Sequence, residues 1–251
     1  MLLSAVLAII SSVAVATAED VGSLIQQGDA YDAQLDTQRA LATYLQAEKL
    51  GSNDPNLFVR IARQYAFSMN DTRAEDEQRD LGEKALSYAK KAVDTDPKNA
   101  KAQLSVAICY GRLAGVSSNR TKVEYSRFVK EYADKALALD STDSYAYHVL
   151  GAWNYELAGI GSFSRTIAKM IYGDIPPASY ENAERYFRKA AAMAPQRVAH
   201  HVELGRTYIA MGKKDQAEQE LRQALTLPSK EKDDPESKRR AVEALKKLRA
   251  D

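Results

Sequence analysis

The chain has 251 residues, and its 35 Lys and Arg residues almost balance its 34 Asp and Glu residues, leaving a formal net charge of +1. This balance excludes the strong positive field by which some proteins attract nucleic acid or a membrane surface. The single cysteine, Cys109, excludes a disulfide within the chain. It lies in an apolar stretch, where a free cysteine packs as a small hydrophobic residue.

The first 18 residues carry no charge and end in Ala16-Thr17-Ala18, just before two acidic residues. An apolar run that closes on a small-x-small sequence is typical of a secretory signal. However, no Lys or Arg precedes the run, and the run is short for a membrane span. A cleaved signal, a membrane-anchoring segment and a buried helix of a soluble protein therefore stay open, and we favour the first two.

After this segment, one spacing of small and aromatic residues recurs along the chain. The first passage is Gly28, Tyr31, Ala40, Tyr44, Ala47, and the last is Gly205, Tyr208, Ala217, Leu221, Ala224. In three middle passages, which begin at Ala62, Ala107 and Gly151, 11, 10 and 20 extra residues separate the two halves of the pattern. This self-similarity indicates tetratricopeptide repeats, in which small residues let two antiparallel helices cross closely.

The pattern predicts five helix pairs, a capping helix and an inserted helix. We expect the pairs at residues 21–33 and 37–50, 56–68 and 82–94, 100–113 and 125–139, 144–158 and 180–193, and 199–211 and 214–225. The capping helix is expected at residues 235–248, and the inserted helix at residues 160–172, before Pro176 and Pro177. The polar insertion 70–80 is expected to form either a solvated loop or an extension of a helix.

The predicted fold is therefore all-α: a tetratricopeptide-like α-solenoid of about five antiparallel helix pairs with an inserted helix and a C-terminal capping helix. Repeats of this kind share one core, so residues 21–248 are expected to form a single domain. The small residues at the helix crossings are expected to be buried packing residues, as at Ala85, Ala92, Ala183 and Ala190.

No motif of catalytic or metal-binding chemistry is found in the sequence. It has no Gly-rich phosphate loop, no His-Glu-x-x-His and no Gly-x-Ser-x-Gly. His200 and His201 are adjacent, so on a helix they point about 100° apart and do not face one another. We therefore predict that the protein is not an enzyme and has no cofactor, no metal site and no nucleic acid partner.

Two sets of residues are candidates for binding a protein partner. A solenoid binds on its concave face, and the first helix of each pair is expected to line it with Val59, Arg63, Leu104, Ile108, His148, Ala152, Val202 and Arg206. Arg63 and Arg206 are its leading polar candidates, because arginine can fork onto a carboxylate. The second set is a basic run near the C-terminus, composed of Lys238, Arg239, Arg240, Lys246, Lys247 and Arg249. Two explanations of this run stay open, a solvated face of the capping helix and a site for an acidic partner, and the solvated face is favoured.

Four stretches of the sequence are more specific than a generic repeat: residues 145–156, 165–172, 176–190 and 204–208. In this order and spacing they resemble the regulator of microtubule dynamics family, over about residues 21–248. The resemblance implies a non-enzymatic protein that associates with microtubules and spindle poles. Some relatives instead sit on organelle membranes, where a tethering member also binds lipid. The family offers no catalytic residues.

Three classes of function follow. The resemblance and the basic C-terminal helix indicate a cytoplasmic microtubule adaptor that acts on the cytoskeleton and the spindle. Residues 1–18 and the apolar inserted helix indicate a membrane-tethered, lipid-binding repeat protein. The small-x-small site indicates an exported interaction module in the secretory pathway.

Overall fold

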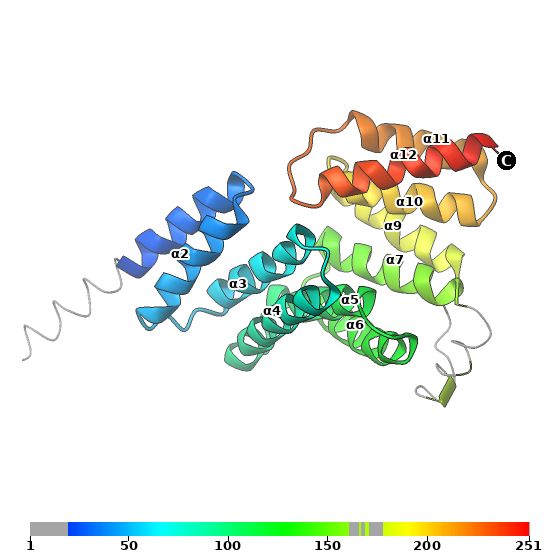
Figure 1. Cartoon of the computed structure of the whole chain (residues 1–251). Coiled ribbons are helices and arrows are strands. Elements are labelled where there is room, and N and C mark those ends of the chain that lie inside the picture. The colour runs from blue at the N-terminus through cyan, green and yellow to red at the C-terminus, as the bar shows by residue number, and fades with distance from the viewer. Residues whose placement is uncertain (1–19, 161–165, 167–168, 171–177, 251) are drawn as a thin grey trace, which may run out of the picture. The chain divides into compact units, whose positions relative to one another are not determined.

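The structure is a computed structural model that describes residues 20–160, 166, 169–170 and 178–250 (Figure 1). Every regular element in these residues is a helix, which confirms the all-α class. The apolar segment 1–18 and most of the expected inserted helix lie outside the described residues. Two compact units divide the chain after Pro97. Because the chain divides into these two units, a single domain over residues 21–248 stays a prediction.

Unit 1 contains two successive helix pairs. Helical residues 20–33 are followed by α2 (Thr37–Lys49), α3 (Pro55–Ser68), the short 3-10 helix η1 (Met69–Asp71) and α4 (Glu75–Thr95). The carboxylate of Asp54 starts α3 by accepting a hydrogen bond from the backbone N–H of Asn56 at 2.8 Å. Pro55 follows at the first helical position, where its missing N–H costs nothing. α3 packs against both α2 and α4.

Unit 2 contains three pairs and a final helix. The pairs are α5 (Ala100–Gly115) with α6 (Asn119–Leu139), α7 (Ser144–Ala158) with α9 (Tyr180–Met193), and α10 (Val198–Ala210) with α11 (Lys214–Thr226). The final helix, α12 (Asp234–Ala250), runs alongside α10 and α11 (Figure 1). Each described pair occurs where the repeat spacing predicts it.

The glycines of the repeat mark the points where two helices touch. A Cβ atom added to Gly28 would lie 2.4 Å from Cε1 of Tyr44, and one added to Gly205 would lie 2.7 Å from Cγ of Leu221. Gly151 meets Phe187 in the same way, at 2.8 Å from Cδ1. Within each pair the large residue occupies the same repeat position. The spacing found in the sequence is therefore the spacing of a physical contact.

The alanines expected at the helix crossings are buried. Ala85, Ala92, Ala183 and Ala190 are each 0% exposed, which confirms that they are packing residues. In the second and third pairs, alanine takes the place of both the glycine and the large residue, with Ala62 and Ala89 in one pair and Ala107 and Ala133 in the other. All four of these residues are also 0% exposed.

Two helices begin earlier than expected. α4 begins at Glu75 instead of residue 82, and α6 begins at Asn119 instead of residue 125. The hydroxyl of Ser118 accepts a hydrogen bond from the backbone N–H of Thr121 and so caps the longer α6. Three acidic residues in the first turn of α4 complement the helix dipole. The insertion at residues 70–80 is thus largely a helix extension, one of the two forms expected.

Candidate partner-binding site

The first helices of the three pairs in unit 2, α5, α7 and α10, are neighbours, because α7 contacts both of the others. They bring together a set of polar and aromatic side chains that are separated in sequence. We call this set the first-helix face; it consists of Arg112, Tyr145, His148, His200, Glu203 and Arg206.

Two histidines from different helices share a hydrogen bond on this face. Nδ1 of His148 lies 3.0 Å from Nδ1 of His200, and Nε2 of His200 lies 3.3 Å from Oγ of Ser144. The rings of Tyr145 and Phe187 pack at 5.1 and 5.3 Å from the His148 ring. Burial among these groups lowers the pKa of both imidazoles below the ordinary value for histidine. The pair is therefore neutral at physiological pH.

His201, the next residue, points to α11 instead. Its Nδ1 lies 2.7 Å from the carboxylate of Glu220, and its Nε2 lies 2.9 Å from the carbonyl oxygen of Pro195. Burial opposes protonation of His201, but these two acceptors outweigh burial and raise its pKa. Across the described residues, no group of three His, Cys, Asp or Glu side chains is placed to hold a metal ion.

Glu203 is a buried acid on α10, only 6% exposed. Nη1 of Arg206 donates a hydrogen bond to one carboxylate oxygen at 2.7 Å, and Nη2 of Arg240 from α12 lies 2.9 Å from the other. The guanidinium of Arg206 also lies over the ring of Tyr155, at 4.9 Å from its centroid. Arg206, predicted as a partner contact, is thus already engaged within unit 2.

The segment between α11 and α12 lies on the first-helix face. We call residues 228–233 the cover segment. Asp233 forms an ion pair with Arg112 of α5, and Glu231 lies 3.3 Å from Arg197 at the start of α10. The sequence pattern does not predict these pairs, because the members of each are 121 and 34 residues apart and neither pair follows the repeat spacing.

The cover segment leads into a firmly held helix. A carboxylate oxygen of Asp234 accepts hydrogen bonds from the backbone N–H groups of Lys230 and Glu231, at 2.7 and 2.8 Å. Farther along α12, Ala241 and Leu245 are buried in an apolar cluster with α10 and α11. Val202, which was expected to line the groove, lies in this cluster and is 0% exposed.

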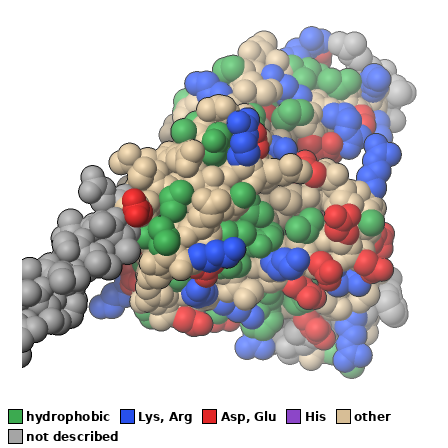
Figure 2. Space-filling view, turned by 60° about the vertical axis from the view of Figure 1, so that its left-hand side comes forward, with side chains coloured by type: hydrophobic (Ala, Val, Ile, Leu, Met, Phe, Trp, Pro, Cys, Tyr) green, Lys and Arg blue, Asp and Glu red, His purple; other side chains and the backbone are tan. Residues whose placement is uncertain are grey.

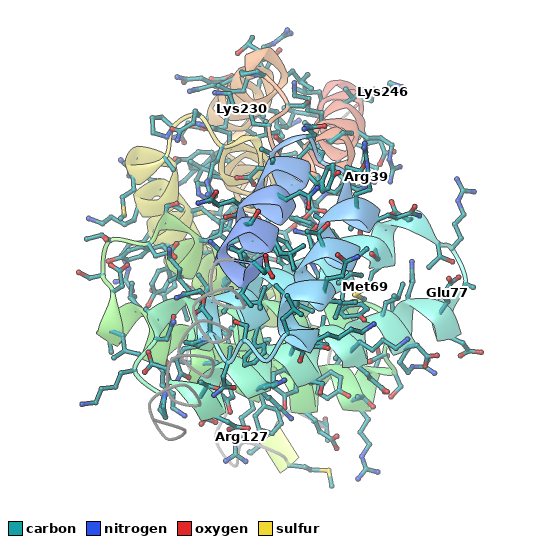
Figure 3. The ribbon with its side chains drawn as sticks, turned by 90° about the vertical axis from the view of Figure 1, so that its left-hand side faces the viewer. Arg39, Met69, Glu77, Arg127, Lys230 and Lys246 are labelled. Carbon is teal, nitrogen blue, oxygen red and sulfur yellow. The ribbon has the colours of Figure 1, made fainter. Side chains whose placement is uncertain are left out.

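The structure divides the basic run of α12 into two parts. Lys238 donates a hydrogen bond to the carbonyl oxygen of Leu227, and Arg240 pairs with Glu203. Arg239 lies between two glutamates of its own helix, 2.6 Å from Glu236 and 2.8 Å from Glu243. Lys246 and Lys247 are exposed, and the side chain of Lys246 points away from the ribbon (Figure 3). The side chain of Arg249 lies outside the described part of the chain.

Arg63, the candidate of unit 1, belongs to a double ion pair. It contacts Asp32, and one turn earlier Nε of Arg60 lies 2.7 Å from Asp29. Asp29 also accepts a hydrogen bond from the hydroxyl of Tyr44 at 2.7 Å. Sequence reasoning missed these acids, although the two aspartates and the two arginines share the same spacing of three residues, which places each set on one helix face.

Comparison with known proteins adds the family. A family model described as "Regulator of microtubule dynamics protein 1-3" matches residues 24–249. The chain belongs to the regulator of microtubule dynamics family. Regulator of microtubule dynamics protein 1 of Mus musculus is 29% identical over 241 residues, which are 94% of this chain and 78% of that protein. Regulator of microtubule dynamics protein 3 of Xenopus laevis is 27% identical over 222 residues, which are 87% of this chain and 48% of that protein.

Solved structures show the fold of this family member. The tetratricopeptide repeat protein TTC0263 of Thermus thermophilus aligns with a TM-score of 0.63 and 18% identity, covering 90% of this chain and 98% of that one. The type IV pilus biogenesis factor PilW aligns with a TM-score of 0.57 and 17% identity, covering 92% and 93%. At these identities the likeness concerns the tetratricopeptide-like fold alone. Within the part of the chain that the structure describes, no helix is both long enough and apolar enough to span a membrane.

Proposed function

We propose that the protein is a non-enzymatic repeat scaffold that binds microtubules and regulates their dynamics in the cytoplasm and at the spindle. The observation that carries this proposal is the family match, which covers nearly all of the described chain. Relatives of both numbered types, from mouse and frog, carry the same words in their names. The helix pairs supply the scaffold of this proposal.

The electrostatics of α12 support a contact with an acidic polymer. Microtubules expose an acidic surface, so a protein of net charge +1 must meet them through a local group of cations. On the face shown in Figure 2, basic and acidic side chains are interspersed and do not form one broad field. Lys246 and Lys247 are exposed on α12. We therefore assign the microtubule contact to the C-terminal part of this helix.

Co-sedimentation tests this proposal. Protein lacking residues 1–18 is mixed with polymerised microtubules over a salt series and centrifuged. We expect the protein in the pellet at low salt and increasingly in the supernatant as salt rises, because exposed charges farther apart than about 8 Å are screened at physiological ionic strength. A protein that stays in the supernatant even at the lowest salt refutes the microtubule proposal, and binding to lipid vesicles then becomes the next assay.

A further inference from the structure

Three side chains of the first-helix face and its border surround the carboxylates of the cover segment. Arg112 contributes from the last turn of α5, and Arg197 from the residue before α10. The guanidinium of Arg197 lies over the ring of Tyr145, 4.9 Å from its centroid. Two fixed cations and a phenol thus come from three separate elements of unit 2.

The carboxylates and these three side chains match in charge and position. Asp233 pairs with Arg112, and Glu231 pairs with Arg197 at 3.3 Å. Burial raises the pKa of Tyr145, and the negative charges of Glu231 and Asp233 raise it further. A short acidic segment with two carboxylates two residues apart is therefore the ligand chemistry that this surface recognises.

The cover segment is held less firmly than the helix that follows it. Side chains of the two ion pairs are between 22% and 34% exposed, and residues 228–230 are exposed. Ion pairs with such access to water contribute little to stability. α12, in contrast, is fixed by the buried side chains of Ala241 and Leu245. The backbone of Lys230 and Glu231 stays tied to Asp234 at the start of α12, so release of the cover segment means that the side chains of Glu231 and Asp233 swing away from Arg197 and Arg112 while α12 remains on α10 and α11.

We propose that Arg112, Tyr145 and Arg197 form a receptor for an acidic peptide segment of a partner protein, and that the cover segment is an internal ligand that competes for it. The partner segment presents two carboxylates within three residues, as Glu231 and Asp233 do. This inference goes beyond microtubule binding, because it concerns a peptide contact in which Lys246 and Lys247 take no part.

A peptide-binding assay with the full chain tests the receptor. The probe is a fluorescently labelled peptide that copies residues 228–236, and binding is followed by fluorescence anisotropy. The double variant Glu231→Gln with Asp233→Asn should bind the probe about five- to tenfold more tightly than the unaltered chain, as expected when two partly exposed ion pairs no longer compete. Adding Arg112→Gln or Arg197→Gln should abolish this gain.

Matched controls isolate the two carboxylates. The variant Glu236→Gln with Glu243→Gln also removes two negative charges, but from the groups that pair with Arg239, so it should bind the probe like the unaltered chain. A probe with Gln and Asn in place of its Glu231 and Asp233 equivalents should not bind. Equal affinity of both double variants for the acidic probe would overturn the proposal.

Proteolysis gives a second readout that needs no variant. Lys230 and Lys232 lie in the cover segment and are sites for trypsin. The probe for this assay has glutamine in place of its two lysines, so that trypsin does not cleave it. At saturation it should increase the rate of cleavage after Lys230 and Lys232 in the unaltered chain, while circular dichroism shows the helices intact. A cleavage rate that no probe concentration changes would show that the segment is a fixed part of the fold. Since microtubules are absent from both assays, these results stand apart from those of co-sedimentation.

Discussion

At the scale of single residues, the buried polar groups of unit 2 are stabilised in two ways: some are kept neutral, and others are paired with an opposite charge. His148 and His200 are kept neutral and share a hydrogen bond, which avoids the large cost of a buried charge. Glu203 lies between the guanidinium groups of Arg206 and Arg240. Removal of one member of a buried charged set costs more than the intact set contributes, because the remaining charge loses its partner. These residues therefore restrict where substitutions are tolerated.

The histidine pair predicts a pH dependence of stability. Because the pKa of His148 and His200 is lowered in the fold, the unfolded chain binds more protons below pH 6.5 than the native one does. The free energy of unfolding should therefore fall between about pH 7 and pH 5, by up to about 1.4 kcal/mol per pH unit for each histidine. Urea denaturation at several pH values measures this slope, and it should be shallower in His200→Gln.

His201 supplies the control for this prediction. Its pKa is raised, so its contribution to stability is present below pH 6.5 and is lost as the pH rises through its folded value. His201→Gln should therefore make the loss of stability on acidification steeper. If both variants change the slope in the same direction, the assigned environments of these histidines are incorrect.

Gly205 predicts a steric effect of a single methyl group. A Cβ atom there would lie 2.7 Å from Cγ of Leu221 and 3.3 Å from the carbonyl oxygen of Ala217. Gly205→Ala should therefore destabilise the protein by about 1–3 kcal/mol through overpacking. Gly115→Ala is the matched control, since a Cβ atom at Gly115 meets nothing within 4 Å. Thermal unfolding followed by circular dichroism compares the two, and equal melting temperatures would contradict the close contact.

At the scale of elements, the sequence predicts the helices and their pairing, but it predicts only some of the helix starts and few of the polar contacts between helices. The spacing from Gly28 to Tyr44 equals that from Gly205 to Leu221, and in both cases the two residues touch across one helix pair. The sequence pattern therefore predicts the pairing of the helices. The start of α6 depends on a single hydroxyl, that of Ser118, which the repeat pattern does not include. The pairing of Asp233 with Arg112 depends on how a connection crosses two repeats, and no periodicity encodes such a crossing.

The role of α12 as a structural element can be measured. Leu245 is 8% exposed and packs in the cluster with α10 and α11, so Leu245→Ala should destabilise the protein by about 2–4 kcal/mol. Val242, on the exposed side of the same helix, is 39% exposed. Val242→Ala should change stability by less than about 0.5 kcal/mol. Chemical denaturation provides both values, and a neutral Leu245→Ala would mean that α12 is not anchored through this residue.

At the scale of the whole molecule, three of the five basic side chains that the structure describes in the C-terminal run of α12 have polar partners within the chain: Lys238, Arg239 and Arg240. The run of six basic residues near the C-terminus is visible in the sequence. The sequence does not show which of these charges are paired within the fold. Arg240 is paired with Glu203 of another helix, and Arg239 lies between Glu236 and Glu243 of its own helix. Among the basic side chains that the structure describes on α12, the candidates for an acidic partner are thereby reduced to Lys246 and Lys247.

The exposure of Lys246 and Lys247 predicts how their replacement affects microtubule binding. Replacing Lys246 and Lys247 by glutamine should weaken microtubule co-sedimentation and make the remaining binding less sensitive to salt, because fewer screened charge contacts remain. Replacing the exposed Lys101 and Lys122 by glutamine removes the same charge from α5 and α6 and should have less effect. Equal losses in the two variants would indicate that net charge alone, and no particular surface, governs binding.

The reciprocal fit between glycine and a large residue has a consequence for how these helices can be recombined. Gly28 is matched to Tyr44, Gly151 to Phe187 and Gly205 to Leu221, whereas Ala62 and Ala107 belong with alanine partners. The helices of each pair are therefore complementary to one another and not interchangeable with those of every other pair. A chimaera that exchanges whole pairs keeps each large side chain opposite its glycine. One that exchanges a single helix between a glycine pair and an alanine pair places a large side chain against an alanine, or leaves a void beside a glycine.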